Sequence, residues 1–315
     1  MTQQLRWLWL VLVTVIAAFG ARPAFAQPVI VVDYSLDTNN FFGAVGSPQR
    51  LVFETAATRL TSRLSDTLTA ITPDANNTWS ATFTHPGTGG AASLANLTIP
   101  QNVIRVYVGG QDLPGNTLGF GGPGGFNIPG ANSQTFVDAI VGRGQPGALG
   151  ANASRTDFGA WGGSISFDSV GPNWNFSLAA PTGSQADFLS VAEHELGHVL
   201  GIGTSPSWRN RIPTNSTTFT GPASTALNGG VNPSVTADGA HWADGTTYLG
   251  QAVAMDPTIT LGTRVEFTEL DYAGLADIGW QVTPVPEPAT VLGLAAVALV
   301  GLRRGRRAFA RTLSA

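Results

Sequence analysis

Apolar positions recur with helical spacing in two segments that frame the central part of the chain. Residues 51–68 (LVFETAATRLTSRLSDTL) place apolar side chains three and four positions apart and follow Ser47 and Pro48, a pattern that predicts an amphipathic helix. Residues 267–280 have the same spacing and predict another helix near the end of this part of the chain.

A third segment, residues 184–200, predicts a helix with two different sides. Ser184 and Asp187 have the spacing of a capping box at its start. At about 100° per residue, His194 and His198 fall on one side, which holds both imidazoles out of the core. The opposite side collects the apolar residues Phe188, Leu189, Ala192, Leu196, Val199 and Leu200.

Short runs between these helices predict strands. Residues 78–84, 103–108 and 163–167 alternate apolar and polar positions or are rich in β-branched side chains, and Gly, Pro and Asn separate them. Residues 114–150 are especially rich in Gly, and we expect them to form surface loops.

The N-terminal residues 1–26 have the pattern of a signal peptide. Arg6 precedes an apolar run over residues 8–19, and Ala24 and Ala26 form an A-x-A cleavage site. We therefore expect export through the inner membrane and a mature chain that begins at Gln27.

The C-terminal residues 284–315 have three parts. A linker with Pro at every second position (VPEP) comes first, an uncharged apolar stretch covers residues 289–302, and a cluster of Arg follows. This segment resembles the PEP-CTERM sorting signal of Gram-negative bacteria. The resemblance implies an exosortase-type sorting enzyme as a partner, transient anchoring in the inner membrane by the apolar helix, and delivery to the cell surface, the extracellular matrix or the medium. An ordinary C-terminal membrane tail is the alternative.

Composition narrows the chemistry of the remaining domain, residues 27–283. The chain contains no Cys, which excludes disulfide bonds and thiolate metal sites. Between residues 27 and 284, nine Arg stand against 19 acidic residues, a net charge near −10. This charge argues against a nucleic-acid partner, because phosphate binding needs the opposite sign.

The helix over residues 184–200 carries the motif H-E-x-x-H. His194 and His198 are one turn apart and can chelate a single ion, while Glu195 projects to the flank where a reacting water would lie. Zn²⁺ is the metal that this pattern predicts. With only four His in the chain, a chance match is rare.

The motif extends to HELGHVLG, and in this form it resembles the metzincin metallopeptidases. Their signature continues from the glycine, here Gly201, to a third histidine three residues later. This chain has Thr204 at that position, and a hydroxyl is a poor zinc ligand. Leishmanolysin-like members separate the glycine from the third histidine by a long insertion, and residues 203–239 resemble such an insertion.

The third ligand must come from elsewhere in the chain. His85 precedes a Pro-Gly turn and has the context of an ordinary loop histidine. His241 lies downstream of the helix, and in metzincins the third ligand precedes a methionine turn, whose place Met255 takes here. We predict His241 as the third ligand, with Asp238 and Asp244 as alternatives.

The resemblance covers roughly residues 45–280 and implies a fold. That fold is a metzincin-like zincin domain of the α/β (α+β) class, loop-rich, with a twisted mixed sheet, an active-site helix and a C-terminal helix. By the same analogy, the strand near residues 161–168 is the edge strand that binds an extended peptide through Trp161, Gly163 and Ser164.

These expectations combine into a function. Zn²⁺ on His194, His198 and His241 would activate water, and Glu195 would act as the general base of an exported endopeptidase that cleaves a protein or peptide substrate. The alternative is a non-catalytic cell-surface or matrix protein with a structural zinc site. The Gly-rich composition and Thr204 support that alternative, and Glu195 argues against it.

Overall fold

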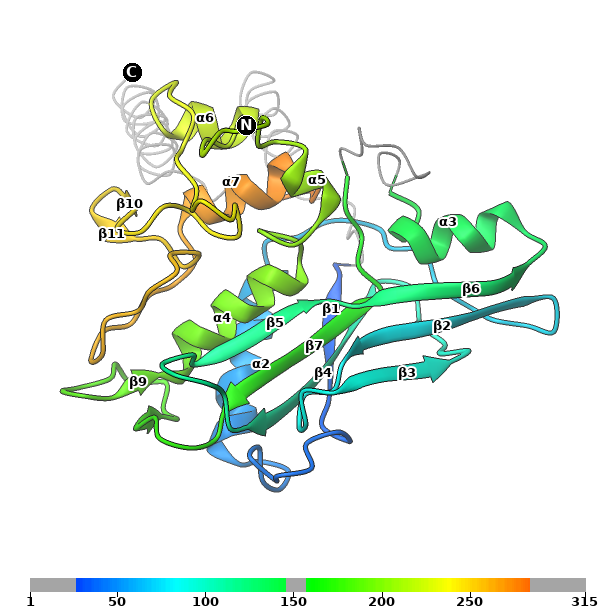
Figure 1. The fold of residues 1–315 in the computed structure, drawn as a ribbon, viewed down its shortest axis with the longest axis horizontal. Coiled ribbons are helices and arrows are strands. Elements are labelled where there is room, and N and C mark those ends of the chain that lie inside the picture. Colours follow the sequence, from blue (N-terminus) through cyan, green and yellow to red (C-terminus); the bar gives the residue numbers. More distant parts are fainter. Residues whose placement is uncertain (1–26, 146–156, 284–315) are drawn as a thin grey trace, which may run out of the picture. The chain divides into compact units, whose positions relative to one another are not determined.

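The computed structural model describes residues 27–145 and 157–283 of the 315-residue chain, which form a mixed α/β fold with several sheets (Figure 1). The main sheet has the strand order β1-β4-β7-β5. Its first three strands are parallel, and β5 lies antiparallel to β7 at the edge. The four strands are β1 (Val29–Asp33), β4 (Val103–Gln111), β7 (Gly162–Asp168) and β5 (Gly119–Pro123).

A second, antiparallel sheet has the order β3-β2-β6. It consists of β2 (Asn77–Thr84), β3 (Ala91–Ala95) and β6 (Gly125–Ala131), and the helix α3 (Gln134–Gly142) packs beside β6. The predicted strands at 78–84, 103–108 and 163–167 are confirmed in β2, β4 and β7.

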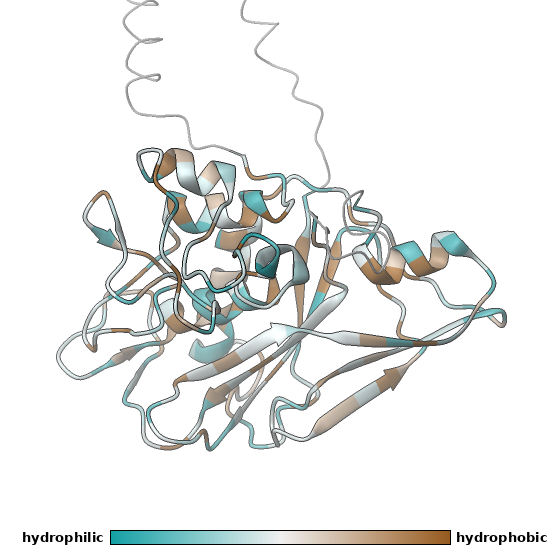
Figure 2. Ribbon diagram, turned by 45° about the horizontal axis from the view of Figure 1, so that its top comes forward, coloured by the Kyte–Doolittle hydropathy of each residue, from teal (hydrophilic) through white to brown (hydrophobic). Residues whose placement is uncertain are grey.

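The central strands β4 and β7 of the main sheet are largely buried on both faces, whereas β1 and β5 carry exposed side chains. Two helices, α2 (Pro48–Thr61) and α4 (Phe188–Val199), pack against each other and cover one face. Ile104 and Val106 of β4 point into this core, whereas Tyr107 points into a second core shared with the β3-β2-β6 sheet and α3. Figure 2 shows hydrophobic stretches along these strands and helices and more polar residues in the loops.

The C-terminal part of the domain is built mostly from loops and short elements. Apart from α4, the longest helix described there is α7 (Glu269–Asp277), which packs against α6. The shorter elements are β8 (Trp174–Asn175), β9 (Ala186–Asp187), α5 (Pro206–Arg209), α6 (Pro222–Leu227), β10 (Thr247–Tyr248) and β11 (Gln251–Ala252).

Helix α2 ends earlier than its sequence pattern predicts. Ser47 caps it at the start as expected, but the helix stops at Thr61 instead of continuing to residue 68. Beyond it, Leu64 forms a bridge with Val282, and the Asp66 carboxylate accepts a hydrogen bond from the backbone of Gln281. These contacts with the end of the domain outweigh the local helical preference.

The expectation of surface loops over residues 114–150 was wrong for the part that the structure describes. Residues 119–131 form β5 and β6, and residues 134–142 form α3. Strand ladders are made by main-chain hydrogen bonds, so β7 and β2 can pair with a Gly-rich segment whose composition carries no strand signal.

Two predictions about the ends of the chain fall outside the described residues. The signal peptide at 1–26 and the apolar helix at 289–302 both lie there. Within residues 27–145 and 157–283, no helix has the length and hydrophobicity that crossing a membrane requires.

Candidate metal centre

Helix α4 presents two imidazoles in a defined tautomer. The Nδ1 atom of His194 lies 2.7 Å from the carbonyl oxygen of Ala254, and Nδ1 of His198 lies 2.9 Å from that of Ile202. A carbonyl oxygen only accepts hydrogen bonds, so each Nδ1 carries the proton and each Nε2 keeps a free lone pair. The two Nε2 atoms are therefore available as metal ligands.

The structure brings His241 to these two histidines. Its Nε2 lies 3.1 Å from Nε2 of His198, which in turn lies 3.1 Å from Nε2 of His194. The three residues form the one group of at least three potential ligands that could hold a metal ion within the described residues, and their ligand atoms lie within 4.8 Å of one another. Residues from two distant parts of the sequence thus converge on one point.

Burial keeps the three imidazoles neutral. It lowers the pKa of His198 to about 4 and that of His194 well below its ordinary value, and it also lowers the pKa of His241. Neutral imidazoles, with lone pairs directed at one another, suit a cation between them.

The other candidates for the third ligand point elsewhere. The carboxylate of Asp238 accepts hydrogen bonds from the Thr236 hydroxyl and the backbone of Ala240, and Asp244 accepts one from the Thr258 hydroxyl. Neither belongs to the cluster of ligand atoms, and His85 does not either.

At the end of α4, Thr204 makes a structural contact at the position where the metzincin signature has its third histidine. Gly201 has a φ of 105°, a left-handed conformation that ends the helix as predicted. The turn brings the carbonyl group of Ile202 to His198. The Thr204 hydroxyl donates to the His198 carbonyl oxygen at 2.7 Å, so it closes the helix end and is not directed at the histidine cluster.

The side of α4 that bears the imidazoles is partly covered: His194 is half-buried and His198 is buried, so the expectation that both are held out of the core holds only in part. His198 is only 7% exposed, and the segment around Met255 packs over this side. A Cβ atom at Gly197 would lie 2.4 Å from the Met255 sulfur, so the fully buried methionine packs directly against the helix between the two histidines.

Glu195 lies on the flank of α4 that faces β5. It is 4% exposed, and its Oε2 atom is buried without a hydrogen-bond partner among the described residues. Burial raises the pKa of its carboxyl group to about 8, and the backbone N–H of Gly121 opposes this rise. A nearby bound cation would favour the ionised form.

Asp271, which the sequence did not single out, connects the segments that carry the site. This fully buried side chain on α7 accepts hydrogen bonds from the backbone N–H groups of Ala254 and Met255 and from the indole of Trp242, next to His241. It also accepts from Thr268, in the capping box that starts α7. One carboxylate thus orients the carbonyl partner of His194, the buried methionine and the third histidine.

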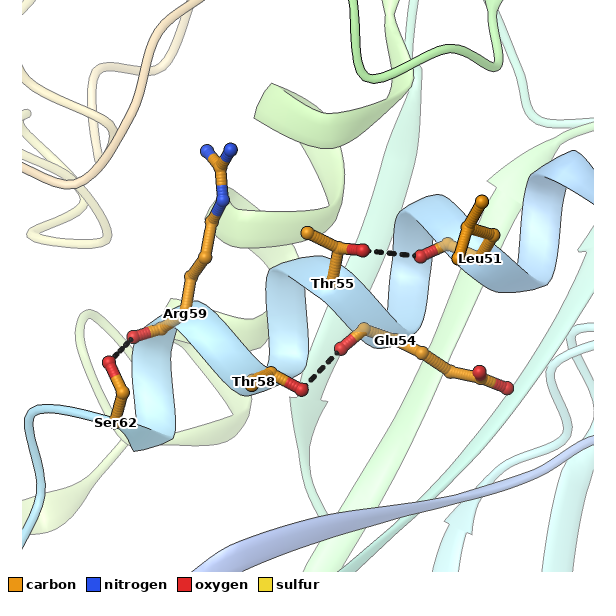
Figure 3. Close-up of a pocket in the computed structure, with 6 residues that line it drawn as sticks. All are labelled: Leu51, Glu54, Thr55, Thr58, Arg59 and Ser62. Carbon is orange, nitrogen blue, oxygen red and sulfur yellow. Dashed lines mark hydrogen bonds between the residues drawn. The ribbon is translucent and has the colours of Figure 1, made fainter.

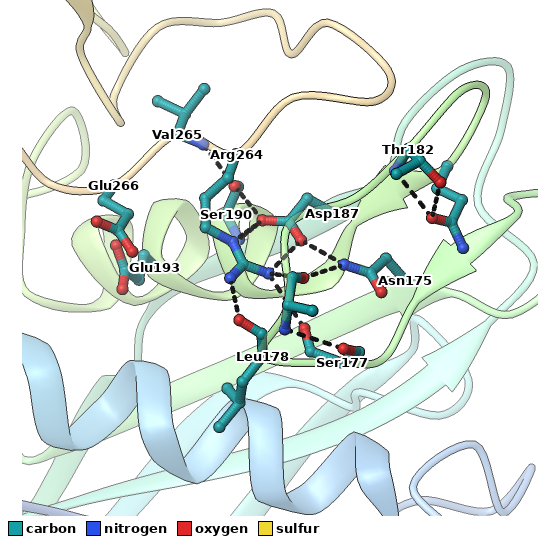
Figure 4. A network of polar contacts seen from close by, with 12 residues as sticks. Asn175, Ser177, Leu178, Thr182, Asp187, Ser190, Glu193, Arg264, Val265 and Glu266 are labelled. Carbon is teal, nitrogen blue, oxygen red and sulfur yellow. Dashed lines mark hydrogen bonds and ion pairs between the residues drawn. The ribbon is translucent and has the colours of Figure 1, made fainter.

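A second buried carboxylate fixes the other end of α4. The helix begins at Phe188 with Asp187 as its N-cap, so the predicted capping box beginning at Ser184 was wrong. The Arg264 guanidinium donates to both oxygens of Asp187 at 2.8 Å and to neighbouring backbone carbonyl groups (Figure 4). This tertiary contact selects Asp187 as the cap, because it holds the carboxylate at the first turn.

We expect Arg264→Lys to lower the free energy of unfolding by about 2 kcal/mol, because a lysine cannot reproduce the paired hydrogen bonds to the buried Asp187. Urea unfolding of the metal-free protein measures this loss. Arg211→Lys is the control, since its guanidinium donates to the backbone carbonyl of Asp277 away from α4. Equal stability of the Arg264→Lys variant and the wild type would contradict the role of this contact.

The assignment of β7 as a substrate-binding edge strand was wrong. β7 lies between β4 and β5, and its backbone pairs on both sides. Trp161 is 1% exposed and donates its indole N–H to the carbonyl oxygen of Gly125, and Ser164 is buried. Residues 163–167 (GSISF) alternate as a strand with one solvated face does, whereas strands buried on both faces are usually more continuously apolar, which explains the error.

A shallow depression on the outer side of α2 does not belong to this site. Its lining residues come from α2 and its C-cap residue Ser62 and include none of the histidines (Figure 3). The hydroxyl groups of Thr55 and Thr58 donate to the carbonyl oxygens of Leu51 and Glu54 in the same helix, so they are already engaged.

The comparisons with known proteins identify one segment of the chain. Residues 284–307 match the PEP-CTERM protein-sorting motif, which confirms that part of the sequence prediction. The motif implies export across the membrane in Gram-negative bacteria and recognition by an exosortase-type sorting enzyme, and placement at the cell surface or in the medium is consistent with it. No curated protein and no solved structure matches the chain.

Proposed function

We propose that the protein is an exported, zinc-dependent endopeptidase with a metzincin-like domain. The observation that carries this proposal is the convergence of the Nε2 atoms of His194, His198 and His241 on one point, with Glu195 on the same helix. The motif H-E-x-x-H-x-x-G on α4 and the buried Met255 beside it also support a metzincin-like arrangement.

The residues present fit zinc. Three neutral imidazoles form a typical donor set for a catalytic zinc ion, which keeps a further position open. The carbonyl groups of Ala254 and Ile202 orient two of the rings through Nδ1, as outer-shell partners of metal-ligating histidines commonly do. Glu195, whose Oε2 atom has no hydrogen-bond partner among the described residues, supplies the carboxylate that a catalytic site needs as a proton acceptor and a structural site does not.

In this proposal the chain's own residues hold and move a proton. When bound, zinc would supply Lewis acidity that activates water and polarises the scissile carbonyl group. The Glu195 carboxylate accepts the proton of the attacking water and later donates it to the leaving amine. The apolar surroundings of α4 exclude bulk water, which strengthens the electrostatic interactions of this carboxylate.

The metal content of the purified protein tests the proposal, together with casein digestion. We expect one zinc per chain and digestion that a chelator stops, with both lost in His241→Ala. His85→Ala is the matched control, because His85 lies outside the cluster. Zinc that persists in His241→Ala would place the third ligand elsewhere. Zinc binding without digestion by the wild type would contradict the enzyme and support a matrix protein with a structural metal site.

A further inference from the structure

The edge strand β5 carries glycine at the two positions that face Glu195. A Cβ atom at Gly119 would lie 2.6 Å from Oε1, 2.8 Å from Cγ and 2.9 Å from Cδ of Glu195. A Cβ atom at Gly121 would lie 2.9 Å from the Glu195 carbonyl oxygen and 3.0 Å from Oε2. Any other residue at either position would occupy space that the Glu195 side chain now fills.

Alternate residues of a strand face opposite sides, and here only one side meets Glu195. A Cβ atom at Gly122 would have no neighbour within 4 Å. Phe120, which also points away from α4, is 57% exposed. The glycines at 119 and 121 therefore do more than make the strand flexible, because they allow its backbone to lie against one carboxylate.

Within the described residues, little besides β5 fixes this carboxylate, and the backbone N–H of Gly121 in that strand interacts with it. Its Oε2 atom has no hydrogen-bond partner there, so packing against β5 limits the positions that the side chain can adopt. A general base must lie within hydrogen-bond reach of the proton it accepts. The β5 backbone that confines the carboxylate thus determines where the carboxylate can accept a proton.

We propose that Gly119 and Gly121 are positioning residues that hold the Glu195 carboxylate in place through the backbone of β5. This inference rests on the function proposed above for Glu195. It adds that the reaction requires a surface without side chains on the edge strand β5. It also adds that a methyl group at Gly119 lowers the catalytic rate without lowering the stability of the fold.

The two glycines differ in what a methyl group would displace. At Gly119 the three nearest atoms all belong to the flexible Glu195 side chain, so alanine would move the carboxylate and leave the backbone in place. At Gly121 the nearest atom is a backbone carbonyl oxygen of α4, so alanine would also push the strand from the helix. Gly119→Ala is therefore the cleaner test.

The experiment compares Gly119→Ala with the matched control Gly122→Ala from the same strand, both in the zinc-loaded full-length protein. We expect Gly119→Ala to keep the zinc content, Tm and KM of the control while kcat for a peptide falls on the order of 10²-fold, as a misplaced group typically causes. Gly121→Ala should lower both kcat and Tm. Crystal structures of the metal-free wild type and Gly119→Ala provide the second readout, and the Glu195 carboxylate should be displaced in the variant.

Each result supports or overturns the inference. A carboxylate that keeps its position in Gly119→Ala, or a displaced carboxylate with the kcat of the control, overturns it. A loss of Tm that parallels the loss of kcat in Gly119→Ala would show a packing role instead. An inactive wild type overturns the proposed peptidase, and the two crystal structures then still decide whether Gly119 fixes the carboxylate.

Discussion

The Glu195→Gln variant is expected to bind zinc as the wild type does and to lose peptide hydrolysis by roughly 10²–10⁴-fold, the usual contribution of a general base. Glutamine has nearly the same shape, so it fits beside β5 and disturbs neither the histidines nor the core. It cannot accept and return a proton. Zinc content by elemental analysis and the rate of peptide cleavage are the two measurements.

Glu193→Gln is the matched control for this variant. Glu193 is another buried carboxyl group on α4, but it accepts a hydrogen bond from the backbone of Phe267 and lies 3.7 Å from the Arg59 guanidinium. Burial raises its pKa to about 7, so an uncharged amide is a mild replacement. We expect this control to retain activity. Hydrolysis that survives in Glu195→Gln, or falls equally in both variants, would contradict the role of Glu195.

The parts of the site that lie within one helix could be predicted from the sequence. The spacing of His194, Glu195 and His198 determines their relative positions once the segment is helical, and α4 is confirmed over Phe188–Val199. The glycine that ends the helix is equally local, because the left-handed φ of Gly201 follows from its place after the last apolar position. Such features depend only on neighbours in the chain.

Long-range features were predictable only in part. His241 was inferred from the small number of histidines and from the metzincin resemblance, and the structure brings it within 3.1 Å of His198. Strand order has no comparable local signal, so β7 was assigned to an edge that β5 occupies. The glycines of β5 carry no strand signal because their role is to leave space for Glu195.

Asp271 was missed for a related reason. In the sequence it is an ordinary acidic residue in the first turn of a predicted helix, where acidic residues are common. Its importance arises from Trp242, Ala254 and Met255, which lie 16 to 29 residues away along the chain. Only the known fold shows that the buried Asp271 carboxylate accepts hydrogen bonds from several residues distant in the chain.

Asp271→Asn is expected to weaken zinc binding roughly 10–100-fold, as changes in the outer shell of a metal site commonly do. It should also lower the free energy of unfolding of the metal-free protein by about 3 kcal/mol, because the amide NH₂ group would face N–H donors and leave buried groups without an acceptor. The carboxylate now orients Met255, the carbonyl partner of His194 and the indole next to His241. Competition with a chromophoric chelator and urea unfolding measure the two effects.

Asp277→Asn separates the effect on zinc from a general loss of stability. Asp277 is a buried carboxylate on the same helix, but its oxygens accept hydrogen bonds from Ala223 and Ser224 of α6 instead of from the segments around His241 and Met255. We expect this variant to lose stability and to keep its zinc affinity. If both variants weaken zinc binding equally, the loss follows from the destabilised helix, and Asp271 has no specific role in orienting the site. If only Asp271→Asn weakens it, the carboxylate couples α7 to the metal centre through the backbone of residues 254 and 255.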